Sequence, residues 1–280
     1  MAQGTIVITG ASSGIGEACA LHFDKKGFRV FAGVRKASDG EALRQKTSDR
    51  LTPLIMDVTD QASVAAAANS IDRKEISGLV NNAGIAISAP VELIPLDKLR
   101  EQLEVNVIGQ VGVIQAFLPL LRQGRGRIVN ISSVAGRSVL PFTGAYSASK
   151  HAIEAISDAL RMELREWAIH VAIIEPGAVK TPIWDKGVQR ANDMIAQFPD
   201  EGLDLYRYLI AKMIAAAAQA SHRGVDPSEV VKAVDHALLD AKPKIRYVVG
   251  KDAKMRMLVN YLPDKMRDNM IMKRINAIKT

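Results

Sequence analysis

The sequence contains little that would place it in a disulfide-rich, metal-binding or hydrolytic class. Its 280 residues include one cysteine, Cys19, so no intramolecular disulfide can form. This excludes a disulfide-stapled secreted fold. No cysteine and histidine residues have zinc-site spacing and no H-E-x-x-H motif occurs, so we expect no metal site. The five histidines are scattered along the chain, which argues against a serine hydrolase.

Long apolar runs are missing as well. No run approaches the ~20 residues that are needed to span a bilayer. The first residues, Met1-Ala2-Gln3-Gly4, lead directly into an apolar segment, without the basic start and apolar stretch of a signal peptide. We therefore expect a cytoplasmic protein. Cys19 follows a glycine-rich turn within a helical pattern, and we expect it to be a small packed side chain rather than a nucleophile.

The positive charge is concentrated at one end of the chain. The net charge is +7, and residues 251–280 account for +5 of it with eight Lys/Arg and three Asp. We expect this segment to be a basic C-terminal extension of two short helices that are separated at Pro263. Docking on the domain or on another subunit is the favoured arrangement, and contact with a membrane surface is the alternative. Without an aromatic platform or a recognised module, we expect no nucleic-acid binding.

Short apolar strands alternate with helices along the chain. We expect strands at 5–9, 28–34, 51–56, 77–80, 127–131, 169–174 and 245–249, and helices at 15–26, after Asp60, at 96–122 and at 145–167. This order predicts an α/β fold, a doubly wound Rossmann-type parallel sheet of about seven strands with helices on both faces, in a single domain over residues 1–250. Residues 181–224 fit no strand–helix unit. Long excursions of this kind are often lids, and we expect this one to cover the substrate.

A glycine-rich turn follows the first strand and reads Thr9-Gly10-Ala11-Ser12-Ser13-Gly14-Ile15-Gly16. Its glycines permit a tight turn and a close approach of backbone N–H groups to a phosphate. The N-terminus of the following helix also favours an anion. The spacing differs from the G-x-G-x-x-G fingerprint. Its place between a strand and a helix nevertheless favours a dinucleotide site over a purely structural turn.

The residues after the second strand favour NADP over NAD. An acidic residue there would bind the ribose 2′-OH of NAD, but this chain has Val34 followed by Arg35 and Lys36. An arginine at this place can bind a 2′-phosphate. We therefore predict NADP(H) as the cofactor. NAD is the alternative, because Asp39 and Glu41 lie close by in the sequence.

Two groups of residues point to proton transfer. Tyr146 and Lys150 are four residues apart at the start of a predicted helix, so their side chains share one face. A nearby ammonium lowers the pKa of a tyrosine, which is ~10 when free, and such a tyrosine can act as a general acid or base. Ser132 and Ser133 follow the fifth strand at the carboxyl edge of the predicted sheet, where open α/β sheets bind ligands. A serine hydroxyl there can hydrogen-bond a substrate oxygen.

Together these motifs resemble the short-chain dehydrogenase/reductase family. In chain order they are Thr9-Gly10-x-x-x-Gly14-x-Gly16, Asn81-Asn82-Ala83-Gly84, Asn106, Ser133, Tyr146-x-x-x-Lys150, and Pro176-Gly177 with Thr181. The resemblance runs from Thr5 to about Thr181. The segment Pro243-Lys244-Ile245-Arg246-Tyr247 and the extension after it resemble the subgroup that includes steroid and retinol dehydrogenases.

The resemblance implies a role for each of these residues. The catalytic set would be Tyr146 as general acid/base, Lys150 holding the nicotinamide ribose and lowering the pKa of the tyrosine, Ser133 orienting the substrate oxygen, and Asn106 holding a water that links Lys150 to solvent. The cofactor-binding set would be Gly10, Ser12, Ser13, Gly14, Ile15, Gly16, Arg35, Asp57, Val58, Asn81, Ala83, Gly84, Tyr146, Lys150, Pro176, Gly177 and Thr181. Three residues have structural alternatives. Asn81 could tie adjacent strands together, Asp57 could cap a loop, and Asn106 could satisfy backbone groups around a helix kink.

We therefore expect an NADP(H)-dependent oxidoreductase that interconverts a lipophilic secondary alcohol and a ketone by hydride transfer, as a homodimer or homotetramer. The apolar content of residues 181–224 favours a lipophilic substrate, although the same side chains could simply pack the lid onto the domain. The enzymatic alternatives are an oxoacyl-thioester reductase and an NAD-dependent steroid- or retinol-type alcohol dehydrogenase. The non-enzymatic alternative is an NADP(H)-sensing regulator, which would be free to lose Tyr146, Lys150 or Ser133. All three are present.

Overall fold

Seven parallel strands form one sheet in the computed structural model, which describes residues 4–72 and 75–278. The strands are β1 (Thr5–Ile8), β2 (Arg29–Val34), β3 (Leu51–Ile55), β4 (Gly78–Asn81), β5 (Arg127–Ile131), β6 (His170–Pro176) and β7 (Arg246–Val249). Their order is β3-β2-β1-β4-β5-β6-β7, and the neighbouring strands are parallel. The predicted fold class is confirmed. Residues 1–3 and 279–280, at the ends of the predicted domain and extension, lie outside the described residues.

The strand order reverses direction beside β1. From β1 the chain builds outward through β2 to β3, and it then returns to add β4 on the other side of β1. Parallel sheets bind ligands in the crevice at the carboxyl ends of the strands, at such a reversal point. The segments that leave β1 and β4 meet there, because Thr9 Oγ1 accepts hydrogen bonds from the backbone N–H groups of Asn82 and Ala83, both at 2.9 Å.

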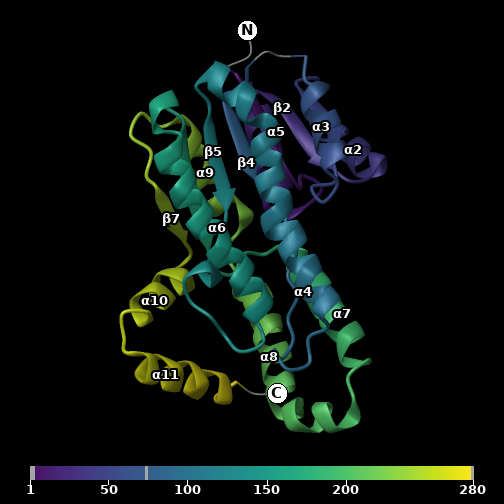
Figure 1. Cartoon of the computed structure of the whole chain (residues 1–280), viewed down its shortest axis with the longest axis vertical. Coiled ribbons are helices and arrows are strands. Elements are labelled where there is room, and N and C mark those ends of the chain that lie inside the picture. The colour runs from purple at the N-terminus through teal and green to yellow at the C-terminus, as the bar shows by residue number, and fades with distance from the viewer. Residues whose placement is uncertain (1–3, 73–74, 279–280) are drawn as a thin grey trace.

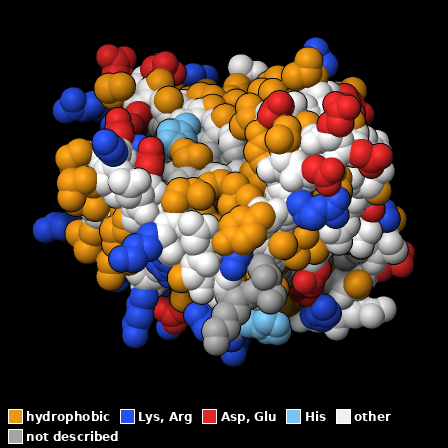
Figure 2. All heavy atoms as spheres, turned by 90° about the horizontal axis from the view of Figure 1, so that it is seen from below, with side chains coloured by type: hydrophobic (Ala, Val, Ile, Leu, Met, Phe, Trp, Pro, Cys, Tyr) orange, Lys and Arg blue, Asp and Glu red, His pale blue; other side chains and the backbone are white. Residues whose placement is uncertain are grey.

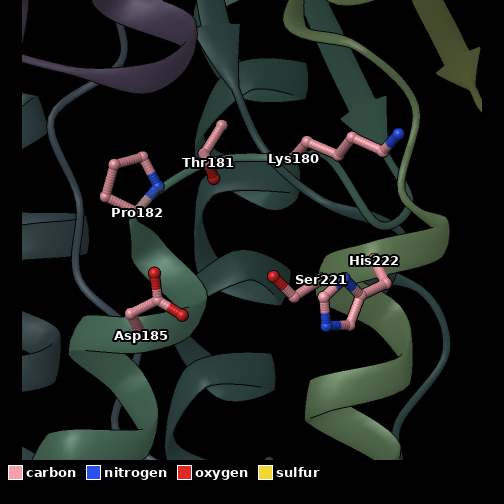
Figure 3. A pocket seen from close by; sticks show the side chains of 6 residues that line it. All are labelled: Lys180, Thr181, Pro182, Asp185, Ser221 and His222. Atoms are coloured by element: carbon pink, nitrogen blue, oxygen red, sulfur yellow. The ribbon is translucent and has the colours of Figure 1, made fainter.

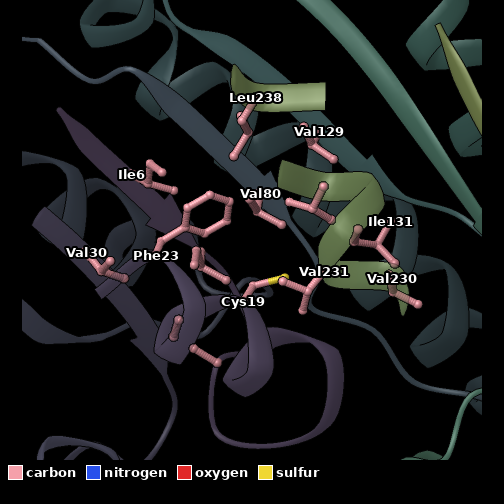
Figure 4. Close-up of a cluster of buried hydrophobic side chains, with 14 of the residues drawn as sticks. Ile6, Cys19, Phe23, Val30, Val80, Val129, Ile131, Val230, Val231 and Leu238 are labelled. Atoms are coloured by element: carbon pink, nitrogen blue, oxygen red, sulfur yellow. The ribbon is translucent and has the colours of Figure 1, made fainter. Parts of the chain in front are cut away.

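Helices cover both faces of this sheet (Figure 1). One face carries α1 (Gly14–Lys25), α2 (Ala37–Arg44) and α9 (Pro227–Leu239), and the other carries α3 (Gln61–Asn69), α5 (Gly109–Gly124) and α6 (Gly144–Glu163). Strands that are covered on both sides are mostly apolar, which explains why Val and Ile dominate β1 and the middle of β6. On the first face Cys19 is buried among Phe23, Val230 and their neighbours (Figure 4). Burial raises the pKa of the Cys19 thiol to about 12, which is consistent with a packed and unreactive side chain.

The predicted helix at 96–122 consists of three consecutive segments. These are α4 (Leu96–Leu103), a π-helical turn (Glu104–Ile108) and α5. By length and composition the whole stretch Leu96–Gly124 could cross a membrane. Its apolar content has a second explanation, because α5 buries four large side chains against the sheet: Val113, Ile114, Phe117 and Leu121. The π-helical turn contains Asn106, and such turns are frequent at functional sites.

Two pairs of helices complete the structure below the sheet in Figure 1. The expected lid forms α7 (Ile183–Ile195) and α8 (Asp200–Arg223), and the extension forms α10 (Lys251–Val259) and α11 (Asp264–Asn276). The break between the last two helices falls at Pro263, as predicted from the sequence. The two pairs touch, because Lys212 of α8 donates a hydrogen bond to the backbone carbonyl of Ile278. The extension is therefore docked on the lid in this structure.

Some predicted boundaries need small corrections. The helix predicted over 145–167 ends at Glu163, and a separate 3-10 turn, Arg165–Trp167, follows it. The chain leaves this turn through Ala168, whose φ of 54° is incompatible with a continuing helix. The sixth strand continues to Pro176 because its last residues pair with β7. These differences do not change the topology.

Candidate active site

An elongated cavity of about 1480 Å³ runs along the carboxyl edge of the sheet. It is lined by the glycine-rich turn, by the residues that follow β2 to β6, by the lid and by both helices of the extension. Pockets for one drug-sized ligand measure roughly 300–1,000 Å³. This cavity is larger, and its volume suits two ligands that lie end to end. One end is formed by the glycine-rich turn and the other by the lid and the extension.

A smaller hollow of about 380 Å³ opens beside this cavity (Figure 3). It lies between the start of α7 and the end of α8 and is lined by Lys180, Thr181, Pro182, Asp185, Ser221 and His222. Thr181 and Pro182 line both spaces, so these two residues form a shared wall. The Tyr146 and Ser133 side chains line only the large cavity. We therefore place the candidate active site there.

The glycine-rich turn has the backbone geometry of a phosphate cradle. Gly10 and Gly14 have φ values of 63° and 62°, in the left-handed region that other residues rarely adopt. A Cβ on Gly10 would lie only 2.9 Å from the Cα of Ala83. The turn leads into the N-terminus of α1, where unpaired N–H groups and the helix dipole favour an anion. This part of the cavity therefore fits the pyrophosphate of a dinucleotide.

Arg35 and Asp57 lie close to each other in the part of the cavity that the glycine-rich turn forms. Arg35 directly follows β2, is exposed and lines the cavity. The pKa of Asp57 is lowered, chiefly by the backbone hydrogen bond from Thr59, and the charge of Arg35 lowers it further. Asp57 Oδ1 accepts from Thr59 N at 3.0 Å and from Thr59 Oγ1 at 2.8 Å, so this carboxylate caps its loop and also lines the cavity. Asp39 and Glu41, which kept NAD open as an alternative, are not among the residues that line the cavity.

Most of the predicted cofactor-binding residues line the cavity. They are Gly10, Ser12, Ser13, Gly14, Ile15, Arg35, Asp57, Val58, Ala83, Gly84, Tyr146, Lys150, Pro176, Gly177 and Thr181. Gly16 does not line it and instead lies behind the turn, where a Cβ would be 2.3 Å from the carbonyl oxygen of Gly10. Its role in the structure is to let α1 pack closely against the turn.

Asn81 is a second predicted residue that lies away from the cavity. It is fully buried, and its Nδ2 donates to the carbonyl of Gln110 in α5 at 3.0 Å. Alternate residues of a strand point to opposite sides, so the cavity receives its neighbour Asn82 instead. Asn82 Nδ2 donates to the carbonyls of Thr9 and Gly10 at 3.0 and 3.1 Å. Asn81 therefore ties β4 to α5, in agreement with its structural alternative, and Asn82 supports the glycine-rich turn.

Asn106 also lies outside the cavity wall. Its Oδ1 accepts from Ile85 N at 2.8 Å, and its Nδ2 donates to Ile85 O at 3.0 Å and to Ser149 Oγ at 3.1 Å. Ser149 Oγ in turn donates to the carbonyl of Tyr146 at 2.7 Å. The side chain thus links the segment after β4 to the first turn of α6. Its backbone partners belong to the loop at Ile85 and not to a helix, so the structural alternative, in which it satisfies helix backbone groups around a kink, is not observed. Through Ser149 it fixes the backbone that carries Tyr146.

Tyr146 and Lys150 occupy one face of α6, with Lys150 Nζ at 5.7 Å from the centroid of the tyrosine ring. Lys150 Nζ donates to the carbonyl of Ile131 at 2.8 Å, and burial lowers its pKa to about 8. Burial raises the pKa of Tyr146, while a hydrogen bond with Ser133 and the charge of Arg256 lower it. The sequence predicted that Lys150 would lower this pKa. In the structure that effect comes from Ser133 and Arg256, because the Lys150 ammonium is directed at a backbone carbonyl.

The serine that faces Tyr146 is Ser133. Its Oγ accepts from Ala135 N at 3.1 Å, makes a longer contact of 3.4 Å with the carbonyl of Pro176, and is hydrogen-bonded to Tyr146. Ser132 Oγ is buried and has no partner in the described part of the chain. Ser133 and Tyr146 therefore present two hydroxyl groups to the cavity. This is the arrangement that a carbonyl oxygen or an alcohol requires.

No pattern in the sequence indicated that the extension contributes side chains to this site. Asp252, at the start of α10, accepts a hydrogen bond from the backbone N–H of Ala178 at 2.9 Å, directly after the Pro176-Gly177 segment. One turn further along α10, Arg256 donates from Nη2 to the carbonyl of Ser138 at 2.6 Å. Both side chains line the cavity. The net charge of residues 251–280 identified a basic segment. Only the packing of α10 shows that, among the arginines of this segment, Arg256 lies near Tyr146.

Comparison with known proteins agrees with this geometry. Residues 4–192 match the family model described as short chain dehydrogenase. Dehydrogenase/reductase SDR family member 9 of Bos taurus is 39% identical over 280 residues, covering 96% of this chain and 87% of that protein. An NADPH-dependent 3-dehydrocapnine reductase of Ornithobacterium rhinotracheale is 38% identical and covers 97% of each chain. Retinol dehydrogenase 16 of Homo sapiens is 39% identical, covering 94% of this chain and 86% of that protein.

Solved structures give the same result. A short chain dehydrogenase from Burkholderia cenocepacia in complex with NADP superposes with a TM-score of 0.74 at 26% identity, covering 96% of this chain and 98% of that one. A short chain dehydrogenase/reductase from Burkholderia phymatum in complex with NAD has a TM-score of 0.74 at 25% identity, covering 88% and 89%. The chain belongs to the short-chain dehydrogenase/reductase family and is an NAD(P)-dependent oxidoreductase that acts on CH–OH groups.

Proposed function

We propose that this chain reduces lipophilic ketones to secondary alcohols with NADPH and catalyses the reverse oxidation with NADP⁺. One observation carries this proposal: Tyr146 and Ser133, which lies close enough to lower the pKa of the tyrosine, line the same cavity as Arg35. The first two residues suit the reacting oxygen, and the third suits the 2′-phosphate. The cavity is long enough to keep the two ends apart.

The cofactor preference follows from the end of β2. The residue that follows this strand is a cation, Arg35, and among the described residues no acidic side chain there lines the cavity except Asp57, which its Thr59 contacts hold. A guanidinium can form paired hydrogen bonds with a phosphate. The relative from O. rhinotracheale is named as NADPH-dependent and the B. cenocepacia structure contains NADP, which supports this choice.

Side chains of this chain can supply the proton that the carbonyl oxygen takes up during reduction. When bound, NADPH supplies the hydride that reduces the carbonyl carbon. The hydroxyls of Ser133 and Tyr146 would hold the carbonyl oxygen. Because burial raises the pKa of Tyr146, its phenol is protonated at neutral pH and can donate this proton to the developing alkoxide. Lys150, with a pKa of about 8, is still mostly protonated at pH 7. Because its Nζ is held on the carbonyl of Ile131, the proton would return to the phenol through a bridging group rather than directly.

The lid supports a lipophilic substrate. Its apolar side chains face the cavity from both α7 and α8, among them Trp184, Val188, Ile195, Ile210, Met213 and Ile214. Trp184 is fixed by a hydrogen bond from its Nε1 to the carbonyl of Val179 at 2.8 Å, which holds the ring at the start of the lid. Lys186, Arg190, Gln219 and Arg223 line the cavity as well, but walls with this many apolar side chains favour an apolar ligand body.

Oxidation of a lipophilic alcohol is the second candidate. The relatives that are named retinol dehydrogenases support it, since they are as similar to this chain as the named reductase is. The two candidates share the fold, the Tyr146 chemistry and the apolar lid. They differ in cofactor and in direction, so one assay can separate them.

The test is an assay of the purified chain with NADPH and a panel of 2-alkanones of increasing length, followed by the loss of NADPH absorbance. The matched reactions use secondary alcohols with NADP⁺ or NAD⁺, and an oxoacyl thioester with NADPH. We expect ketone reduction whose kcat/KM rises with chain length. Turnover of the thioester alone would support the oxoacyl-thioester alternative, and tight NADPH binding without any turnover would support a sensor. Either result would overturn the proposal.

A further inference from the structure

A guanidinium without an ionic partner lies at the substrate end of the cavity. Arg256 is partly buried and lines the cavity together with Ser133 and Tyr146. Its Nη2 donates to the carbonyl of Ser138, but its Nε is buried and has no hydrogen-bond partner among residues 4–72 and 75–278. An unsatisfied buried donor on a charged group is costly, and native proteins rarely retain one without a reason. The group is therefore a candidate for binding something that enters the cavity.

The position of Arg256 is fixed by the docking of α10. Asp252 holds the N-terminus of this helix on Ala178, and Asn260 near its end donates to the carbonyl of Arg137. The contact with Ser138 adds a third attachment to the same side of the site. The guanidinium is thus held beside the loop that follows Ser133. Its charge is close enough to lower the pKa of the Tyr146 phenol.

The charges around Arg256 leave it without a neutralising ion pair. Asp252 and Tyr146 stabilise its charged form, while burial and the positive Arg274 of α11 destabilise it, so that the pKa of Arg256 is lowered. Neither Arg256 nor Arg274 makes a salt bridge within the described residues, although both line the cavity. Arg246 shows the contrast, since Glu154, Asp158 and Glu175 surround it at 2.7–3.2 Å. Arg256 and Arg274 are therefore free to bind an anion.

Apolar side chains also line this end of the cavity, beside the polar lid residues Lys186, Arg190, Gln219 and Arg223. Side chains from three helices line it, namely Met213, Ile214 and Ala217 of α8, Val259 of α10, and Ile271 and Ile275 of α11. Seen from below, hydrophobic side chains surround a hollow in this face of the molecule (Figure 2). A ligand that fits such a space has a charged group near the reacting carbon and a hydrocarbon chain beyond it.

We propose that the substrate is an amphiphilic ketone whose anionic group, a carboxylate, sulfonate or phosphate, binds Arg256 with Arg274 beside it. This inference rests on the proposed ketone reduction. The carbonyl lies against Ser133 and Tyr146, and the alkyl chain extends between α8 and α11. Charge-assisted hydrogen bonds to a guanidinium would fix the end of the substrate next to the reacting carbon and set its orientation.

The first experiment compares matched ketones with the wild-type chain and NADPH. The probes are a 2-alkanone and ketones of the same chain length that carry a sulfonate, a phosphonate or a carboxylate close to the carbonyl. We expect kcat/KM for the best anionic ketone to exceed that of the neutral one by about 10-fold or more, the scale of one hydrogen-bonded charge pair. Arg256→Met should reduce this ratio at least ~10-fold, and Arg256→Lys should restore part of it. Lys254→Met, on the exposed side of the same helix, is the matched control and should keep the wild-type ratio.

Two results would overturn the anion site. One is a wild-type enzyme without a preference for the anionic ketones. The other is an Arg256→Met variant that loses activity equally on neutral and anionic ketones, with a shifted pH profile, which would assign Arg256 to tuning of the Tyr146 pKa alone. Comparison of the kcat/KM values of the three anionic ketones shows which anion is preferred.

A second measurement uses the wild-type chain and does not depend on turnover. The NADPH complex is titrated with an alkyl sulfonate, an alkyl phosphonate and the neutral alcohol of equal length. Tighter binding of the anions by about 10-fold supports the inference, and equal binding contradicts it. Turnover of neutral ketones without any anion preference would leave the proposed function intact while overturning this inference. Absence of turnover with every ketone would contradict the proposed function, and the titration would still decide the anion site.

Discussion

The two ends of the cavity are built in different ways. At the cofactor end, residues up to Thr181 are placed by backbone geometry, as in the left-handed Gly10 and Gly14 and in the strand end that presents Arg35. At the substrate end, the helices of the lid and the extension are held by contacts of single side chains with distant backbone groups, such as that of Asp252 with Ala178. The comparison indicates that this fold separates a fixed cofactor site from a substrate site that can change without disturbing it.

The sheet at the cofactor end is also more completely buried than the helices at the substrate end. Strand β1 is buried throughout, whereas the 24-residue helix α8 buries only Gly202 and Lys212. In α10 and α11 the buried residues are Ala253 and Ile275. Regions with few buried apolar side chains open more readily than a core. We therefore expect the substrate end to open while the sheet remains folded, and the following predictions test this contrast in order of decreasing effect.

The largest effect is expected from Tyr146→Phe, which removes the proton donor and keeps the ring. Turnover of ketones should fall at least ~100-fold, the usual scale for loss of a general acid or base. NADPH affinity should change little, because the phosphate cradle is at the other end of the cavity. Steady-state kinetics and an NADPH titration of the variant measure the two effects. A variant with near wild-type turnover would contradict the assigned chemistry.

A methyl group should weaken cofactor binding when it is added at the cofactor end of the cavity and should leave it unchanged when it is added at the substrate end. Gly10→Ala forces an alanine into a φ of 63° and against Ala83, so we expect NADPH affinity to fall about 10-fold or more, as a strained turn costs roughly 1–3 kcal/mol. Gly187→Ala, in the lid helix α7, is the matched control, since the nearest atom to its added Cβ is 3.9 Å away. Similar NADPH affinities for the two variants would remove the contrast between the ends.

The third prediction concerns the attachment of the extension. Asp252→Ala leaves the Ala178 N–H without its acceptor, and we expect a loss of about 1–3 kcal/mol in the free energy that keeps α10 docked. Faster proteolysis within residues 251–278 and a higher KM for the ketone should follow, with little change in NADPH affinity. Asp264→Ala is the control, because its carboxylate pairs with Arg267 at an exposed position on α11. Equal proteolysis of both variants would contradict this attachment.

The smallest effect should appear as a pH dependence of stability. The pKa of Lys150 is about 8 in the folded chain and 10.5 ordinarily, so the unfolded chain holds more protons between these values. The contribution of this group to the free energy of unfolding therefore rises with pH across that window, by about 1–2 kcal/mol from pH 8 to pH 9.5. Urea unfolding of the wild type and of Lys150→Met at both pH values measures the difference. The exposed Lys254→Met should show no such pH dependence relative to the wild type, and a flat wild-type difference would contradict burial of the Lys150 charge.

The difference between the cofactor end and the substrate end also explains which features could be predicted from the sequence. The parallel sheet, the glycine-rich turn and the Tyr146–Lys150 pair follow from local patterns, because strand alternation, glycine torsions and helical spacing depend on near neighbours. The fold class and the family were predicted correctly from these signals. Asn81 shows the limit of such patterns, since a one-residue difference along a strand decides whether a side chain faces the cavity or α5.

Arg256 could not be predicted from the sequence. It is one of eight basic residues in the last thirty, and no spacing separates it from the exposed Lys254 or Arg274. Its place beside Tyr146 depends on the docking of α10 through Asp252 and Asn260 onto backbone groups more than seventy residues away in the chain. Contacts of this range leave no trace in composition or periodicity.

The measurement that tests the central claim most directly is a titration of the wild type, Arg35→Ala and Lys36→Ala with NADPH and NADH, followed by cofactor fluorescence. Lys36 is exposed and does not line the cavity, so Lys36→Ala is the matched loss of charge. We predict that the wild type and Lys36→Ala bind NADPH at least ~10-fold more tightly than NADH, and that Arg35→Ala loses this preference. Equal or tighter binding of NADH by the wild type, or an equal loss of both cofactors in Arg35→Ala, would contradict the account.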